Sequence, residues 1–315
     1  MRNQMVTVFG GSGFIGRYVV QRLARRDARI KVPSRTPNRV RHLQPMVSPG
    51  QIAIGPLNLG SEEALTRYLQ GVHAVVNLIA ILHERRSGQF ETVHVDLPGR
   101  IGRAAKAAGV ERLVHVSAIG ADAGSSSAYA RTKAGGERAM REAFPEAVIL
   151  RPSVVFGPED EFLNRFAAMA RLLPALPLIG GGRTRFQPVY VGDVADAVLA
   201  GLTSPDAVGQ TYELGGPRIY TFEELMRWLL RTIDRKRFLV PISFDLARLQ
   251  GRILEHLPEP PLTRDQVELL KHDNVVGEGA RTLADLGIRP TPMELIAPDY
   301  LVRYRASPRQ RVTAR

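Results

Sequence analysis

Residues 5–17 read MVTVFGGSGFIGR, and this stretch decides the expected fold. Met5–Phe9 is a short apolar run typical of a strand, and Phe14 to Arg26 has apolar side chains at helical spacing. The glycines between them satisfy both G-x-x-G-x-x-G and G-x-G-x-x-G: Gly10, Gly11, Gly13 and Gly16. Such a turn lets the backbone approach a pyrophosphate, and the helix that follows offers free N–H groups and a positive dipole end. The stretch therefore predicts a dinucleotide-binding turn.

Short strand-like runs and helical patterns alternate through the first 150 residues. Further strands are expected at Arg29–Pro33, Gln51–Ile54, Ala74–Ala80 and Leu113–Ser117. Ser61 is suited to cap a helix, and another helix is expected through Gly99–Ala108. This alternation predicts an α/β fold, a Rossmann-type doubly wound parallel sheet.

The pattern loosens after about residue 150. We expect the nucleotide-binding Rossmann domain over 1–150, with returning segments from about 151 to 215, and a smaller irregular lobe over 216–303. Helices are expected in that lobe at Phe222–Arg231 and Phe244–His256. The basic tail over 304–315 lacks an apolar pattern and is expected to be disordered.

Composition excludes several classes of site. The chain has 315 residues and no cysteine, so disulfides, thiolate metal sites and a cysteine nucleophile are excluded. The seven histidines lack metal-ligand spacing, and no metal is expected. The net charge is +12, from 43 basic and 31 acidic residues, but the arginines are scattered without a nucleic-acid motif. The charge fits an anionic ligand, anionic lipid or an acidic partner better than nucleic acid. No apolar run reaches the roughly 20 residues of a membrane span, so a cytoplasmic protein is expected.

The end of the second strand indicates which dinucleotide is bound. An NAD site usually has a carboxylate there that accepts from the ribose 2′-hydroxyl. Here Val32 and Pro33 lead into Ser34 and Arg35, which can donate to a 2′-phosphate, and Arg17 is a second cation near the turn. These residues favour NADP(H). The alternative is that Arg35 is an ordinary solvated surface arginine.

Tyr129 and Lys133 form a Y-x-x-x-K pair whose spacing places both side chains on one helical face. A neighbouring ammonium stabilises a phenolate, so the phenol can exchange protons near neutrality. Lys133 can also hold the nicotinamide ribose, and Ser117 follows a strand where a hydroxyl can polarise a carbonyl. Ser117 fits a strand-end cap equally well.

An apolar segment in the second half allows two interpretations. Phe238–Ile242 is followed by a helical pattern in which Arg248 and Arg252 lie opposite an apolar face. That face comprises Phe244, Leu246, Leu249, Ile253, Leu254 and Leu257. This face suits the core of the lobe. It also suits contact with a membrane or a membrane subunit.

These features together resemble the extended and atypical short-chain dehydrogenase/reductase superfamily. The resemblance includes the glycine turn and the Tyr129–Lys133 pair. It extends to Arg151–Pro158, similar to an RPxxxxGP stretch beside the nicotinamide, and Gln187–Ala195, similar to a VxVxDVA signature in which Asp193 begins a helix. The aspartate that commonly follows the third strand in the superfamily is replaced here by Gly55-Pro56-Leu57-Asn58.

A closer resemblance is to the NADPH-binding accessory subunits of respiratory complex I. It is carried by long strings in the same order: 8–10, 16–20, 42–46, 125–127, 143–147, 159–167, 187–191, 286–288 and 291–292. It implies a structural NADPH, complex I subunits as partners, and a peripheral position on the cytoplasmic side of a bacterial inner membrane, where the peripheral and membrane arms meet. The residues expected at the cofactor are Gly10, Gly11, Ser12, Gly13, Phe14, Ile15, Gly16, Arg17, Ser34, Arg35, Leu78, Ile79, Ala80, Val116, Ser117, Tyr129, Lys133, Pro152, Ser153 and Val154.

The sequence leaves the chemistry open. In the first hypothesis the nucleotide is structural, and Tyr129, Lys133 and Ser117 are a vestigial catalytic group. In the second, the same residues serve a working NADP-dependent reductase, epimerase or dehydratase. In the third, the chain is an NADPH sensor that reports the nucleotide's state to a partner.

Overall fold

The computed structural model describes residues 1–255, 257 and 260–306. The chain divides into two compact units. Unit 1 comprises Met1–Pro152, Val191–Leu214 and Gly277–Arg289, and unit 2 comprises Ser153–Tyr190, Gly215–Val276 and the described part of Pro290–Arg315. This division differs from the lobe expected over 216–303, because 277–289 belongs to unit 1 and 153–190 to unit 2.

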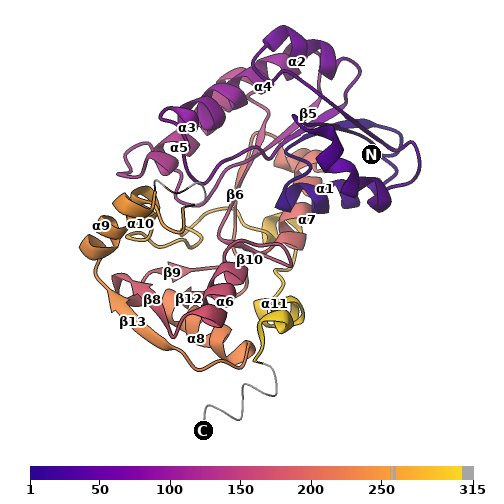
Figure 1. Cartoon of the computed structure of the whole chain (residues 1–315). Coiled ribbons are helices and arrows are strands. Elements are labelled where there is room, and N and C mark those ends of the chain that lie inside the picture. Colours follow the sequence, from indigo (N-terminus) through magenta and orange to yellow (C-terminus); the bar gives the residue numbers. More distant parts are fainter. Residues whose placement is uncertain (256, 258–259, 307–315) are drawn as a thin grey trace. The chain divides into compact units, whose positions relative to one another are not determined.

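A seven-stranded sheet forms the centre of unit 1, in the order β11–β6–β5–β4–β1–β2–β3, and its strand pairs are parallel (Figure 1). Its strands are β1 (Met5–Phe9), β2 (Arg29–Pro33), β3 (Ile52–Gly55), β4 (Ala74–Asn77), β5 (Arg112–Val116), β6 (Val148–Pro152) and β11 (Thr211–Leu214). The strand order reverses between β1 and β4, which is where doubly wound sheets bind their ligands. The predicted fold class is confirmed.

Helices cover both faces of this sheet. They are α1 (Phe14–Ala24), α2 (Glu62–Leu69), α3 (Gln89–Glu91), a π-helix (Thr92–Asp96), α4 (Leu97–Ala107), α5 (Ala128–Ala143) and α7 (Val191–Thr203), with 3₁₀ turns at Pro37–Met46, Pro205–Ala207 and Ala284–Leu286. Phe9, Val75 and Leu113 pack on one face against α2, α4 and α5. On the other face α1 and α7 lie side by side (Figure 1). Because both faces are covered, strands such as β4 are buried throughout.

Unit 2 is built from small sheets and helices around an aromatic core. Its strands pair as β7 (Val155–Phe156) with β10 (Val189–Tyr190), β8 (Ala175–Ile179) with β13 (Phe238–Ile242), and β9 (Arg185–Phe186) with β12 (Tyr220–Thr221). Its helices are α6 (Leu163–Leu172), α8 (Phe222–Thr232), α9 (Phe244–Leu254), α10 (Arg264–Leu269) and α11 (Met293–Leu301), with 3₁₀ turns at Gly180–Gly182 and Val302–Tyr304. Phe162, Phe186 and Phe222 pack their rings together in the core.

Several predicted boundaries shift for local reasons. The strand expected to reach Ala80 ends at Asn77, because the Asn77 carboxamide accepts a hydrogen bond from the Ile79 N–H (3.2 Å) and turns the chain out of the ladder. The helix expected from Gly99 begins at Leu97, directly after the π-helix. The helix expected to reach His256 ends at Leu254, and His256 lies outside the described residues. Ser61 caps α2 as predicted, accepting from the Ala64 N–H (3.1 Å).

The chain's end is ordered further than expected. Tyr304 lies in the last 3₁₀ turn, and its carbonyl accepts a hydrogen bond from Arg235 Nε (2.8 Å). Residues 307–315 of the predicted tail lie outside the described residues. No helix in the described part of the chain combines the length and apolar character needed to cross a bilayer.

Candidate functional site

The glycine turn joins β1 to α1 and requires glycine at defined positions. Gly10 has a φ of 77°, in the left-handed region that favours glycine. A Cβ on Gly10 would lie 3.1 Å from the Leu78 carbonyl carbon, so the turn packs directly on the end of β4. A Cβ on Gly16 would lie 2.3 Å from the Gly10 oxygen, so only glycine lets α1 start this close to the turn. The turn and Leu78 thus meet at the strand-order switch point.

The N-terminus of α1 is left available to an anion. Its N-cap residue is Gly13, with no side-chain cap, and the first turn holds no acidic residue. Unused N–H groups and the positive dipole end therefore face the glycine turn. Ser12 to Gly16 supply this end of the site, and Arg17 follows within α1.

Ser34 and Arg35 lie directly after β2, the neighbour of β1. The Ser34 hydroxyl accepts from the Thr36 N–H (3.1 Å), which leaves its own proton to donate. Arg35 is exposed and forms no ion pair with the described residues. Asn58, where the superfamily often has an aspartate nearby, instead accepts from the Gly60 N–H (2.9 Å) and closes a local turn.

The segment Leu78–Ala80 is fixed by two buried polar side chains. Asn77 accepts from Ile79 and donates through Nδ2 to His115 Nδ1 (3.1 Å). Because the Ile79 N–H can only donate, the Asn77 oxygen must face it and the Asn77 Nδ2 must face His115. His115 Nδ1 is therefore the acceptor. Burial, with the charge of Lys133, holds the pKa of His115 well below its usual range, so this ring is neutral.

Lys133 and Ser117 meet the end of β5. The Lys133 side chain is 2% exposed, and its Nζ donates to the Val116 carbonyl (3.0 Å), its one hydrogen-bond partner among the described residues. Burial lowers the pKa of Lys133 to about 8, an effect that Glu137 partly opposes. Ser117 is 5% exposed, and its Oγ has no partner within the described chain. Buried polar groups with unused hydrogen-bonding capacity indicate a ligand site.

Tyr129 is held on α5 by an aromatic cluster. Its ring lies edge-on to His94 (5.3 Å between centroids) and to Phe90 (5.9 Å), which stack on each other. His94 Nε2 accepts from the Ile81 N–H (3.1 Å), so the proton of the neutral ring is on Nδ1 and is donated to Thr132 Oγ1 (3.1 Å). Burial, then the charge of Lys133, lowers the pKa of His94 to about 3.

The last three predicted cofactor residues are divided between the units. Pro152 ends β6 in unit 1, where its carbonyl accepts from the Ile119 N–H (3.0 Å). Ser153 and Val154 belong to unit 2. There the Ser153 hydroxyl donates to Asn274 Oδ1 (2.7 Å), which also accepts from the Val154 N–H (3.0 Å). Their contact with a cofactor stays a prediction.

Four further residues near the predicted site were not predicted from the sequence: Asn77, His94, His115 and Thr132. Two of them had a local signal in the sequence, because Thr132 is adjacent to Lys133 and Asn77 ends a strand. The pairing of His94 with Thr132 had none, because it depends on how the π-helix packs on α5. That packing is close: a Cβ on Gly136 would lie 1.8 Å from the His94 carbonyl oxygen.

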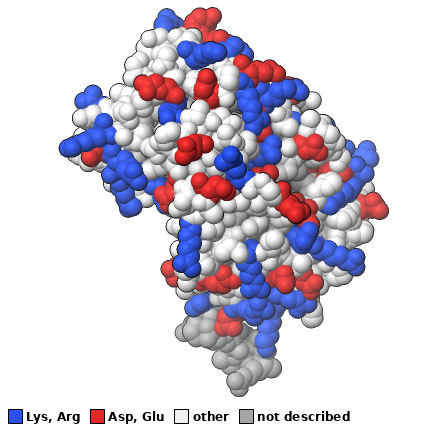
Figure 2. Space-filling model, turned by 180° about the vertical axis from the view of Figure 1, so that it is seen from behind, with Lys and Arg blue, Asp and Glu red and all other residues white. Residues whose placement is uncertain are grey.

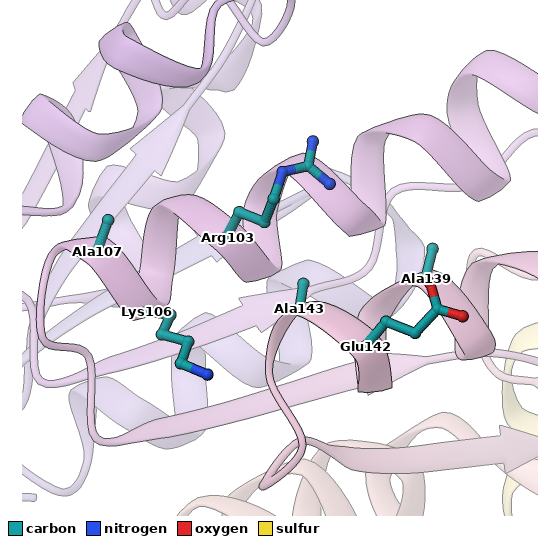
Figure 3. Close-up of a pocket in the computed structure, with 6 residues that line it drawn as sticks. All are labelled: Arg103, Lys106, Ala107, Ala139, Glu142 and Ala143. Atoms are coloured by element: carbon teal, nitrogen blue, oxygen red, sulfur yellow. The ribbon is translucent and has the colours of Figure 1, made fainter.

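Two surface features lie apart from these residues. A pocket between α4 and α5 is lined by side chains of both helices, as Figure 3 shows: Arg103, Lys106, Ala107, Ala139, Glu142 and Ala143. On the face shown in Figure 2, basic and acidic side chains are interleaved.

Comparisons with known proteins identify the family of the chain. The model of the NAD dependent epimerase/dehydratase family matches residues 6–215. NADH dehydrogenase (ubiquinone) 1 alpha subcomplex subunit 9 of Mus musculus is 38% identical, over 96% of this chain and 80% of its own, and that of Arabidopsis thaliana is 34% identical, over 96% and 78%. Ceramide reductase of Caulobacter vibrioides is 31% identical over 75% of this chain and 73% of its own.

Solved structures support the fold. An NADPH-dependent quinone oxidoreductase from Escherichia coli, complexed with NADPH, is 21% identical with a TM-score of 0.74, over 94% of this chain and 99% of that chain. The seven-stranded sheet with its glycine turn is an NAD(P)-binding fold. The chain belongs to the NAD dependent epimerase/dehydratase family and, within it, to the family of the complex I alpha subcomplex subunit 9 proteins.

Proposed function

We propose that the chain binds NADP(H) at the carboxyl edge of the unit 1 sheet and serves as an accessory subunit of respiratory complex I. The observation that carries the role is the similarity to the mouse subunit over nearly the whole chain. The observation that carries the ligand is the glycine turn after β1 together with two buried, incompletely bonded groups at the end of β5 in the same sheet, Lys133 and Ser117.

Each part of the site has a role toward the dinucleotide. The glycine turn and the start of α1 hold the pyrophosphate through backbone N–H groups. Leu78–Ala80, fixed by Asn77, lies beside the turn and borders the bound chain of the nucleotide. Lys133 donates its unused N–H bonds to the nicotinamide ribose. The bound nicotinamide supplies hydride chemistry to any substrate, whereas Ser117 and Tyr129 can only orient a carbonyl or exchange a proton.

NADP(H) is preferred because the end of β2 has a cation and no carboxylate. An arginine fork matches a 2′-phosphate, and Arg35 has no competing ion pair in the described chain. Arg35→Asp is expected to weaken NADPH binding at least tenfold more than NADH binding, since it removes a charge-assisted bond and adds repulsion. Titration calorimetry with both nucleotides measures this. Arg67→Asp, an exposed arginine on α2, is the matched control. Equal losses for NADPH and NADH would remove Arg35 from the phosphate site.

The nucleotide is structural in this proposal, and the subunit stabilises the junction of the peripheral and membrane arms on the cytoplasmic side of a bacterial inner membrane. Mild-detergent purification of the tagged native protein from membranes tests this. Complex I subunits should co-purify, with about one NADP(H) released per chain on denaturation. A chain recovered alone in the soluble fraction would contradict the accessory role.

A second function is favoured by a specific observation. The Tyr129–Lys133 pair is intact, with the phenol ring positioned by His94, and a relative in the comparison is named as a reductase. In this alternative the chain is an NADP-dependent reductase, epimerase or dehydratase. Substrate-dependent oxidation of NADPH that Tyr129→Phe abolishes would establish it.

A further inference from the structure

Unit 2 exposes large apolar side chains where α6 ends and β13 begins. Leu172 is 81% exposed and Phe238 is 77% exposed, and Leu173 and Val240 are exposed beside them. We call these four residues the apolar patch. They are neighbours through the backbone, because the Phe238 N–H donates to the Pro174 carbonyl (3.1 Å) and β13 pairs in register with β8. Contiguous exposed apolar side chains indicate an interaction surface.

The patch is a consequence of strand alternation. Leu239 packs against the aromatic core of unit 2, so Phe238 and Val240 must point the other way. The sheet has only two strands, and nothing in the described part of unit 2 covers this side of β13. Phe238 and Val240 therefore do not contribute to the core, and core packing does not account for their apolar character.

Basic residues precede both parts of the patch in the chain. Arg171 precedes Leu172, and Arg235, Lys236 and Arg237 precede Phe238; we call these four residues the basic cluster. None of them forms an ion pair within the described chain. Arg235 lies close to Arg237 and Arg171, since burial followed by the charges of these two arginines lowers the pKa of Arg235. Arg237 also donates to the Ala170 carbonyl (2.7 Å), which fixes it at the end of α6.

A second apolar stripe lies on α9, the helix that follows β13 in the chain (Figure 1). Leu246, Leu249 and Ile253 recur at helical spacing and are exposed, whereas Ala247 and Gly251 are buried against the segment that begins α10. The α9 face predicted from sequence is therefore divided: Leu246, Leu249, Ile253 and Leu257 are exposed, whereas Phe244 packs against the buried Ala247 and Val267. Arg248, predicted on the opposite side, pairs with Glu268 (3.0 Å).

We propose that the apolar patch, the basic cluster and the α9 stripe attach this chain directly to an anionic phospholipid membrane. Unpaired cations beside exposed leucine and phenylalanine match the boundary of a bilayer, where headgroup phosphates lie next to acyl chains. The inference does not depend on the complex I role, since it concerns the isolated chain.

Flotation of the purified full-length chain with vesicles tests the proposal. Vesicles are phosphatidylcholine alone or phosphatidylcholine with about one third phosphatidylglycerol. The chain should bind the anionic vesicles and lose binding in high salt. The charge variant is Arg171→Gln with Lys236→Gln, two exposed side chains without hydrogen bonds in the described structure, and it should weaken binding about fivefold for each charge removed.

Matched variants separate the contribution of the apolar side chains from that of the positive charges. Leu172→Gln with Phe238→Gln should weaken binding to anionic vesicles about tenfold or more. Leu295→Gln, on an exposed leucine of α11, and Arg67→Gln on α2 should bind as the wild type. Circular dichroism melting confirms that all variants fold. Equal binding to both vesicle types, or unchanged binding by both double variants, overturns the proposal. Variants that bind vesicles normally but no longer co-purify with complex I would show a protein-docking surface instead.

Discussion

At the scale of single residues, the ammonium of Lys133 is the group that most clearly awaits a ligand. It is buried, with one carbonyl partner among the described residues, and its pKa is lowered to about 8 because burial penalises the charged form. A bound ribose would add acceptors and favour the charged form. NADPH affinity is therefore expected to fall as the pH rises through 8, by about tenfold between pH 7 and pH 9. Fluorescence titration of bound NADPH across this range measures the effect.

A matched variant isolates the contribution of Lys133. Lys133→Arg keeps a positive charge through the whole range, so its affinity, whatever its absolute value, should vary little between pH 7 and pH 9. If the wild type and this variant show the same pH dependence, another group titrates and Lys133 does not contact the nucleotide.

His94 makes a prediction about stability in acid. Its neutral ring is fixed by Ile81 and Thr132, and its native pKa of about 3 lies below the unfolded value of 6.5. Between these values the unfolded chain binds the extra proton, so native stability falls as the pH drops below 6.5, by about 1.4 kcal/mol per pH unit. His94→Asn lacks this proton. Between pH 7 and pH 5 the wild type should therefore lose about 2 kcal/mol more of its free energy of unfolding than the variant does.

Urea unfolding at the two pH values checks this expectation. His115 is present in both proteins, so its own acid sensitivity cancels in the comparison. Parallel losses of stability in wild type and variant would show that His94 is accessible to protons in the native state.

At the scale of elements, the β1–turn–α1 segment depends on Gly16. A Cβ there would overlap the Gly10 carbonyl and the Gly11 backbone, and no flexible side chain can move aside to relieve it. Gly16→Ala is expected to cost about 2–3 kcal/mol of stability and at least a hundredfold in NADPH affinity, since the turn must open to admit the methyl group. Calorimetric melting and nucleotide titration measure the two effects.

Gly124→Ala is the control for this substitution. It lies in the loop after β5, where the nearest atoms to a new Cβ are the Asp122 carboxylate oxygens at 3.6 and 3.8 Å, both ordinary contacts. An equally tolerated Gly16→Ala would mean that the glycine turn does not set the approach of α1.

Sequence patterns predicted the elements that depend on local periodicity. The strands Met5–Phe9 and Arg29–Pro33 and the start of α1 at Phe14 are confirmed to the residue. The patterns failed where side chains distant in sequence decide the backbone. Asn77 ends β4 through its own carboxamide, and the π-helix forms where Gly136 of α5 admits the His94 carbonyl. Periodicity carries no information about such pairings.

The candidate site divides in the same way. The glycine turn and the Tyr129–Lys133 spacing are local signals, so both were predicted. The buried hydrogen bonds of Asn77, His94 and His115 join segments 13 to 38 residues apart, and only the fold brings them together. Ser153 was expected at the cofactor, yet its hydroxyl is bonded to Asn274 of unit 2, a partner 121 residues away.

At the scale of the whole molecule, the question is whether the intact Tyr129 serves chemistry or only architecture. Tyr129→Phe keeps the ring that packs on Phe90 and His94 and removes only the phenol oxygen. If the nucleotide is structural, a strain lacking this chain should recover complex I assembly and bound NADP(H) equally with wild type and Tyr129→Phe. Gly16→Ala should fail to restore either, because it removes the nucleotide itself. Native gels with nucleotide quantification give both readouts. If the wild type restores assembly and Tyr129→Phe does not, the phenol oxygen has a function that a structural nucleotide does not require. This result would favour the hypothesis of a catalytic NADP-dependent enzyme.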